Sequence, residues 1–365
     1  MSMASLFDPI RLGSIEAPNR IFMAPMTRGR ATRDHVPTGL MAQYYGQRAS
    51  AGLIVSEAIG ISLQGLAWPY APGIWHDEQV EAWSAVTDAV HEAGGRIVAQ
   101  LWHMGRLTHS SFQGRGRPIS ASATTAPGLA QTYEGKLPYE EARALDVAEI
   151  LALIDQFANA ARNAIRAGFD GVQIHAANGY LLDQFLRSSS NLRCDKYGGG
   201  PENRTRLLEE VTVAVAQCIG ADRTAVRLSP NGEIKGVNDD NPEELFVAVA
   251  KTLSTLGIAF LEVREPAFDG TNGKADRLPI APRMRKAFSG PLVLNSDYDA
   301  EKGQAMLDAG EADAISFGRP FIANPDLPSR IARRKALSPS DPASWYSRGA
   351  EGYTEVQQQP GAIRT

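Results

Sequence analysis

Residues 168–180 read Gly-Phe-Asp-Gly-Val-Gln-Ile-His-Ala-Ala-Asn-Gly-Tyr, and this stretch decides the fold. The run from Gly171 to His175 is short and mostly apolar, which predicts a buried strand. The preceding segment, 146–167, places its apolar residues on one helical face. Asp146 is suited to cap the start of that helix and Gly168 to end it. A helix that ends just before a buried strand is typical of an α/β protein with a parallel sheet.

The same alternation of helix and strand recurs along the whole chain. Short apolar runs rich in β-branched residues read as parallel strands that are buried on both faces. The predicted strands are Ile21–Ala24, Gly52–Glu57, Arg96–Trp102, Gly171–His175, Thr224–Leu228, Ile258–Val263, Pro291–Asn295 and Ala312–Phe317. Further helices are predicted from Asn241 to Gly257 and from Asp299 to Gly310. Eight strands with room for a helix after each predict a closed (β/α)8 TIM barrel, forming a single domain over residues 1–365.

Three qualifications accompany this prediction. An open, doubly wound sheet is the alternative, but no glycine-rich phosphate loop follows the first strand. Residues 107–143 show no helical pattern, and we expect them to form a loop-like excursion on the active-site side of the barrel. The tail, residues 354–365, is expected to be flexible.

Composition narrows the possible partners and location. The 365 residues are 43% hydrophobic and 21% charged, with a net charge of −4, so no basic excess indicates a nucleic-acid or membrane partner. The first residues lack the pattern of a signal peptide, and no stretch has the length of a membrane span. We expect a cytoplasmic protein, monomeric or homodimeric, that acts on a small molecule.

A metal centre is not expected. The two cysteines, Cys194 and Cys218, are too few for an iron–sulfur cluster or a structural zinc site. His103 and His109 lie close in sequence but without a carboxylate cluster, so both are interpreted as polar surface or loop residues.

Polar residues at the predicted strand ends are the candidates for chemistry, because barrel enzymes build their active sites there. His175 and Asn178 can both donate hydrogen bonds to one substrate oxygen, and Tyr180 can supply a proton. Gln100 offers a donor and an acceptor to the edge of a flavin, and Arg227 a positive charge. Gly318-Arg319 follows the eighth strand, where barrels commonly bind phosphate.

Motifs from one end of the chain to the other match one known pattern. They include Ala24-Pro25-Met26-Thr27-Arg28, Gln100-Leu101-Trp102-His103, Gly179-Tyr180-Leu181-Leu182 and Phe317-Gly318-Arg319-Pro320. In these motifs the chain resembles the Old Yellow Enzyme family, in its branch of bacterial nitro-ester, enone and N-ethylmaleimide reductases. The resemblance implies a barrel that binds FMN tightly, takes a hydride from NADPH or NADH, and reduces activated alkenes with ping-pong kinetics. Nitro compounds and nitrate esters are further substrates that it implies.

The resemblance also implies a role for each site residue. His175 and Asn178 would bind the activating oxygen, Tyr180 would protonate the α-carbon after hydride from flavin N5 reaches the β-carbon, and Thr27 would tune the flavin through its O4. The other cofactor-binding residues would be Pro25, Met26, Ala58, Gln100, Arg227, Ser296, Asp297, Phe317, Gly318 and Arg319, with His175 beside them. The substrate pocket would be shaped by Trp68, Trp102, Ile234 and Tyr353. For Trp68 and Tyr353 a packing role is an equal alternative.

Some residues depart from the family pattern or stay unassigned. Asn295-Ser296-Asp297 stands where glycines are usual, which puts an anion near the expected phosphate. Asp183 and Arg187 are interpreted as solvated residues without a role.

Two other functions stay open at this point. One is a flavin-free barrel lyase or isomerase that binds a phosphate at Arg319. The other is a protein that holds flavin without turnover.

Overall fold

A closed barrel of parallel strands forms the centre of the molecule. The computed structural model describes residues 4–112, 116–271 and 273–356. The barrel strands, in their order around the barrel, are β3 (Ile21–Met23), β4 (Ile54–Gly60), β5 (Ile97–Trp102), β10 (Gly171–Ala176), β11 (Thr224–Leu228), β12 (Phe260–Arg264), β13 (Leu292–Asn295) and β14 (Ala314–Phe317). The last strand pairs with the first, in parallel. All eight predicted strands are present, and closure confirms the (β/α)8 fold over the open sheet.

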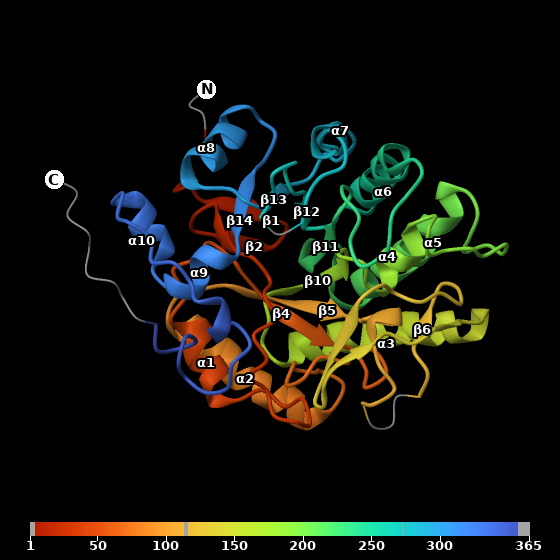
Figure 1. Ribbon diagram of the computed structural model, residues 1–365. Helices are drawn as coiled ribbons and strands as arrows, with labels where there is room; N and C mark the ends of the chain where they lie inside the picture. Colours follow the sequence, from red (N-terminus) through yellow and green to blue (C-terminus); the bar gives the residue numbers. More distant parts are fainter. Residues whose placement is uncertain (1–3, 113–115, 272, 357–365) are drawn as a thin grey trace.

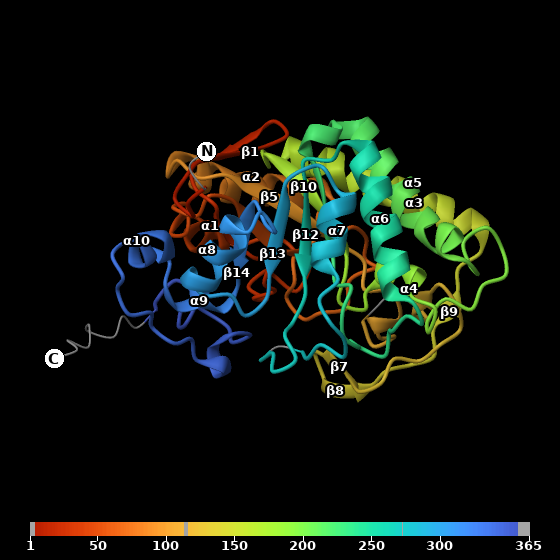
Figure 2. The same cartoon turned by 90° about the horizontal axis from the view of Figure 1, so that it is seen from above.

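Helices surround the strands, as Figure 1 and Figure 2 show. They are α1 (Gly39–Gly46), α2 (Asp77–Glu92), α3 (Val147–Arg166), α4 (Leu181–Leu186), α5 (Pro201–Ile219), α6 (Pro242–Leu256), α7 (Ala281–Ala287), α8 (Ala300–Asp308), α9 (Arg319–Ala323) and α10 (Leu327–Ala332), with short 3-10 turns η1 (Gly105–Leu107), η2 (Ala221–Arg223) and η3 (Pro342–Ser344). The predicted caps are confirmed. The Asp146 carboxylate accepts a hydrogen bond from the backbone N–H of Glu149 at 2.8 Å, and Gly257 takes a left-handed conformation at the end of α6.

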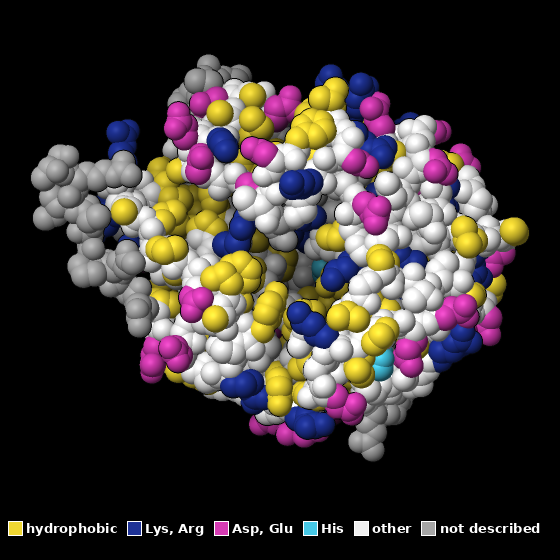
Figure 3. All heavy atoms as spheres, viewed as in Figure 1, with side chains coloured by type: hydrophobic (Ala, Val, Ile, Leu, Met, Phe, Trp, Pro, Cys, Tyr) yellow, Lys and Arg dark blue, Asp and Glu magenta, His cyan; other side chains and the backbone are white. Residues whose placement is uncertain are grey.

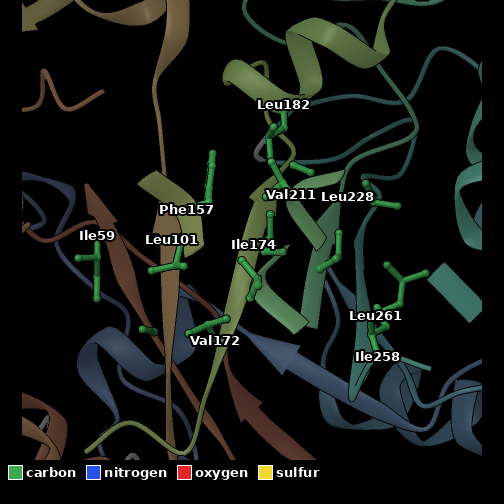
Figure 4. Close-up of a cluster of buried hydrophobic side chains, with 14 of the residues drawn as sticks. Ile59, Leu101, Phe157, Val172, Ile174, Leu182, Val211, Leu228, Ile258 and Leu261 are labelled. Carbon is green, nitrogen blue, oxygen red and sulfur yellow. The ribbon is translucent and has the colours of Figure 1, made fainter. Parts of the chain in front are cut away.

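The outer faces of the strands pack against the helices through apolar side chains. Figure 4 shows Val172 and Ile174 of β10, Leu101 of β5 and Leu228 of β11 in this layer, near Phe157 of α3. These side chains are fully buried. Each Å² of apolar surface removed from water stabilises the fold by about 25 cal/mol. This burial is the main force that holds the helices on the barrel.

The inside of the barrel has two layers of different character. At the amino ends of the strands an apolar cluster gathers Phe22, Val55, Val98, Ala225, Phe260 and Val293. The hairpin of β1 (Ile10–Leu12) and β2 (Ile15–Ala17) closes this end, with Leu12 and Ile15 packed into the cluster. Side chains alternate faces along a strand, and two residues further along most of the strands the next inward side chain is polar. The polar layer lies toward the carboxyl ends, where the candidate residues are.

The segment 107–143 carries more structure than the sequence indicated. It forms a hairpin of β7 (Leu129–Thr132) and β8 (Gly135–Pro138), and β6 (Ile119–Ser120) pairs with β9 (Arg143–Ala144). Figure 2 shows β7 and β8 at the end of the molecule opposite β1. The expectation of a segment without regular structure is therefore corrected, although its position on the active-site side agrees with the prediction.

Residues 354–365 fall only partly within the described chain. Thr354 is buried, and its carbonyl accepts a hydrogen bond from the Gln47 amide at 3.1 Å. The rest of the predicted flexible tail, from residue 357 on, lies outside the described residues. None of the helices within the described ranges is long and apolar enough to cross a membrane.

Candidate active site

A continuous hydrogen-bonded chain of polar side chains crosses the inside of the barrel. The Gln100 amide donates to the Gln173 amide oxygen at 2.8 Å, and the Gln173 nitrogen donates to the Glu262 carboxylate at 2.6 Å. Arg227 is ion-paired to the other oxygen of Glu262 and donates to the Asn295 amide oxygen at 2.7 Å. All five side chains are buried. The predicted residues Gln100 and Arg227 therefore belong to one network, of which Gln173 and Glu262 were not foreseen.

The predicted trio on β10 and the loop that follows it comes together. The His175 and Tyr180 rings lie 5.0 Å apart, edge to face, and Trp102 of β5 lies 4.9 Å from Tyr180. Asn178 has a positive φ of 60°, which asparagine tolerates better than most residues, and its backbone N–H donates to the Ser229 hydroxyl at 2.8 Å. This conformation brings Asn178 to the same mouth of the barrel as His175 and Tyr180.

Burial sets the protonation states of the two titratable groups in this trio. Burial, and then the nearby charge of Arg227, lowers the pKa of His175 well below its ordinary value, so the imidazole is neutral. Burial, and then Tyr139 and Tyr346, raises the pKa of Tyr180, so its phenol keeps its proton at neutral pH. A neutral donor beside a protonated phenol is the arrangement that a carbonyl substrate requires for polarisation and protonation.

His175→Asn is expected to make the free energy of unfolding depend less steeply on pH in the acid range. Because the folded-state pKa of His175 lies below its unfolded value of about 6.5, the unfolded chain takes up a proton first as pH falls. The free energy of unfolding should therefore fall below about pH 6.5, by at most about 1.4 kcal/mol per pH unit for this one group. Urea unfolding of both proteins at pH 7, 6 and 5 measures the difference. An unchanged slope in the variant would contradict the buried neutral state.

The segment after β3 is fixed by a buried carboxylate. The Glu57 side chain on β4 accepts hydrogen bonds from the backbone N–H groups of Arg28 at 3.1 Å and Gly29 at 3.2 Å. This holds the preceding residues, Pro25, Met26 and Thr27, half-buried at the mouth of the barrel. Ala58 is buried on the adjacent strand. These positions agree with the expected wall for a flat ring system.

The residues expected to hold a phosphate gather after β13 and β14. Asp297 is ion-paired to Arg319 and accepts a hydrogen bond from the backbone N–H of Thr271 at 2.9 Å. Burial alone would raise the pKa of the Asp297 carboxyl, but its bonds with Thr271 and Arg319 outweigh burial and hold that pKa low. The anion that departs from the family pattern thus has its own cationic partner.

The backbone beside this ion pair is the second part of the expected phosphate site. Ser296 and Gly318 lie half-buried there, whereas the Phe317 side chain belongs to the core. For Phe317, the backbone is therefore the part that can contact a ligand.

Arg264 is a further cation near this place that the sequence analysis did not select. It ends β12, is buried, and pairs in register with Asn295. Burial, and then the charge of Arg227, lowers the pKa of Arg264 to about 10, while Asp297 acts in the opposite direction. Its position two residues after Glu262 on the inward face was the signal that could have revealed it.

The expected pocket walls divide into two groups. Trp102 packs on Tyr180, and the carbonyl of Ile234 lies 2.9 Å from where a Cβ on Gly179 would stand, so both line the mouth. Trp68 is half-buried and packs against Tyr346 at 5.3 Å. Tyr353, however, is fully buried and stacked on Tyr44 at 4.0 Å. The structure therefore favours a packing role for Tyr353.

Two polar residues interpreted as solvated are buried instead. Asp183 and Arg187 form an ion pair at 2.8 Å with no exposed side-chain surface. The second oxygen of Asp183 accepts the backbone N–H of Gly179 at 2.9 Å, which supports the turn that carries Asn178. His103 and His109, expected at the surface or in loops, are also buried. A charge pattern along one short helix could not reveal that α4 is covered on all sides.

Asp183→Asn is expected to lower the free energy of unfolding by about 3–5 kcal/mol, because it leaves the buried Arg187 charge uncompensated. Denaturant unfolding measures the change. The matched control is Asp77→Asn, which removes an ion pair with Arg166 at the surface and should change stability little. Equal effects of the two substitutions would contradict the support that Asp183 gives to the turn.

The site presents polar atoms that lack partners in the protein. Arg227 Nε, His175 Nδ1 and Asn178 Oδ1 are buried and have no hydrogen-bond partner among the described residues. Buried polar atoms are nearly always bonded, so this cluster indicates a ligand with several polar groups. Figure 3 shows the face hollowed near its centre, with basic and hydrophobic side chains around the hollow. These residues fit a flavin, because Arg227 and Gln100 can bond the polar groups of its pyrimidine edge.

Comparison with known proteins gives the family. Residues 5–338 match the NADH:flavin oxidoreductase / NADH oxidase family. The chain is 41% identical to chanoclavine-I aldehyde reductase from Penicillium roqueforti over 97% of its length and 96% of that protein's. It is 40% identical to a probable flavin mononucleotide-dependent alkene reductase from Leishmania infantum, over 97% of each chain.

Solved structures agree with this assignment. An Old Yellow Enzyme homologue from Zymomonas mobilis is 60% identical, with a TM-score of 0.96 over 98% of this chain and 100% of that one. Morphinone reductase is 43% identical, with a TM-score of 0.93 over 98% and 96% of the two chains. Another structure of morphinone reductase holds tetrahydroNAD. The fold, the predicted FMN cofactor and the nicotinamide hydride donor are thereby confirmed. The chain belongs to the NADH:flavin oxidoreductase / NADH oxidase family and, within it, to the Old Yellow Enzyme ene-reductases.

Proposed function

We propose that this ene-reductase acts on small alkenes conjugated to a carbonyl or nitro group, with His175, Asn178 and Tyr180 as its catalytic residues. The observation that carries the proposal is the unpartnered buried atom His175 Nδ1 beside the Tyr180 phenol, with the Asn178 amide at the same mouth of the barrel. FMN, when bound, supplies the chemistry of hydride transfer: it accepts a hydride from NADPH or NADH and returns one to the alkene.

The protein's own groups supply binding and the proton. Neutral His175 and the Asn178 amide donate hydrogen bonds to the activating oxygen, which withdraws electrons from the double bond. Their placement in a buried site strengthens this polarisation, because little water competes for the oxygen. Tyr180 then gives its phenol proton to the α-carbon, which completes the net addition of H2.

The positions of the other residues around the mouth support a proposal for the remaining flavin contacts. Thr27 lies on the segment fixed by Glu57, where its hydroxyl is suited to flavin O4. Pro25, Met26 and Ala58 provide the wall, and Arg227 and Gln100 provide the pyrimidine contacts. Arg319, Gly318 and Ser296 hold the phosphate, with Arg264 as an added cation.

Location and assembly stay predictions. From the sequence we propose a cytoplasmic location and a monomeric or homodimeric state. We also propose that the protein's partners are small molecules and not nucleic acids or membranes. The alternatives of a flavin-free lyase and of a flavin carrier without turnover are set aside, because the family and the relatives are reductases.

Anaerobic stopped-flow spectroscopy tests the proposal. The purified protein should be yellow, NADPH or NADH should bleach the flavin, and 2-cyclohexenone should restore the colour. A colourless protein that takes up no added FMN would defeat the proposal. Bleaching without reoxidation by enones, maleimides or nitroalkenes would instead show that the substrate class is wrong.

A further inference from the structure

Glu262 is a buried carboxylate at the centre of the polar layer. One of its oxygens is ion-paired to Arg227 and the other accepts from Gln173 at 2.6 Å. Its side chain is 1% exposed, and that of Arg227 6%. The two residues are direct neighbours in register across β11 and β12. A charge pair this deep inside the barrel is costly to desolvate, and a pair of apolar residues would often be as stable, so its presence points to a role in the site.

The pair occupies one terminal nitrogen of Arg227 and leaves other donors of the guanidinium for a ligand. One terminal nitrogen bonds Glu262 and the other bonds Asn295, whereas Nε has no partner among the described residues. Arginine offers five N–H donors, of which these two bonds use two, and Nε–H is among the donors left for a ligand. The same carboxylate offsets much of the positive charge that Arg227 brings to that ligand.

Glu262 also determines the direction of the amide chain. A carboxylate only accepts hydrogen bonds, so Gln173 must turn its NH2 group toward Glu262 and its oxygen toward Gln100. Gln100 must then donate to Gln173, as the structure shows. The acceptor oxygen is the end of Gln100 that remains for a ligand. An acceptor from Gln100 and a donor from Arg227 are together complementary to the N3–H and N1–C2=O groups of a flavin.

We propose that Glu262 is a positioning residue that sets the donor–acceptor pattern of the flavin site and lowers the reduction potential of the bound FMN. It does so through Arg227 and Gln100, without touching the ring. Reduced flavin is anionic at the pyrimidine end, so a carboxylate behind Arg227 disfavours the reduced form relative to the oxidised form. The inference rests on the flavin placement proposed above.

Glu262→Gln is the direct test. It keeps the shape, removes the negative charge and allows the amide chain to reverse, which would turn a donor of Gln100 toward the flavin. We expect the ratio of the Kd for oxidised FMN to the Kd for reduced FMN to rise about tenfold, which for a two-electron couple equals about +30 mV. Potentials are measured by anaerobic reduction against a reference dye, with FMN present throughout purification. An unchanged or lowered potential in an FMN-loaded variant would overturn the proposal.

Two further variants separate charge from hydrogen-bond direction and guard against misfolding. Asn295→Asp adds a negative charge to the other terminal nitrogen of Arg227 and should shift the potential in the opposite direction. Gln173→Met cuts the amide chain but keeps the Glu262 charge, so it should weaken FMN binding in both redox states alike. Should Glu262→Gln not fold, a potential that does not fall in Asn295→Asp would still overturn the proposal.

Asp313→Asn is the matched control. It removes the carboxylate partner of Arg285, an ion pair at the amino end of β14, and should leave the potential unchanged. A wild-type protein without affinity for FMN would defeat the proposed function itself. A wild-type protein that binds FMN, with a Glu262→Gln variant of equal potential, would defeat only the role of Glu262.

Discussion

Tyr180→Phe is expected to slow alkene reduction about 10²–10⁴-fold, the usual contribution of a positioned general acid. The phenylalanine keeps the edge-to-face contacts with His175 and Trp102, so the pocket should retain its shape. Only the proton source is lost. Because burial raises the pKa of Tyr180, the wild-type phenol should remain protonated and active through neutral pH.

The two half-reactions separate this role from a structural one. In anaerobic stopped-flow experiments, FMN reduction by NADPH or NADH should stay close to the wild-type rate, while reoxidation by 2-cyclohexenone becomes slow. A nitroalkene, whose reduced form is a stable anion, should be affected less than an enone. An equal loss in both half-reactions would show that Tyr180 is not the proton donor.

The second large effect is expected for His175→Ala. Removing one donor to a developing oxyanion typically costs about 10²–10³-fold in rate, and His175 is one of two such donors here. Binding of phenols, which place an oxygen at the same point, should weaken in parallel. FMN affinity should change less, because Gln100, Arg227 and the phosphate contacts are untouched.

Asn178→Ala provides the matched comparison, since it removes the other donor, although alanine tolerates the left-handed backbone position less well than asparagine. Steady-state kinetics and phenol titrations, followed in the flavin spectrum, measure both variants. His175→Ala could instead lose most of its FMN, while the fraction that still holds FMN binds phenol with normal affinity. In that case His175 would be a cofactor residue and not the substrate's partner.

The sequence was sufficient for the strands, the helices and the family, for reasons visible in the structure. Each barrel strand is covered by helices, so its outward residues are apolar and its presence is plain. Caps such as Asp146 act within a few residues, which makes them readable locally. The strand-end trio was found because its members lie within six positions of one another.

Two members of the polar layer were missed because their contacts join distant parts of the chain. Gln173 and Glu262 each stand alone in an apolar run, and they meet across 89 residues of sequence. The runs were interpreted as apolar strands buried on both faces, so their inward polar residues on β10 and β12 were not selected. Asp183 and Arg187 were missed for a related reason, since only the packing of α4 reveals that neither reaches water.

The hairpin of β1 and β2, which forms a plug at the amino end of the barrel, has a consequence for how this enzyme can evolve. It seals the barrel with apolar contacts at the end away from the chemistry. The amino end of the barrel thus contributes to stability, whereas the loops at the carboxyl end determine which substrate binds. Loops such as the β7–β8 hairpin should therefore accept insertions, exchanges or randomised libraries with little loss of soluble expression, whereas equal changes at the plug should be selected against whatever the substrate.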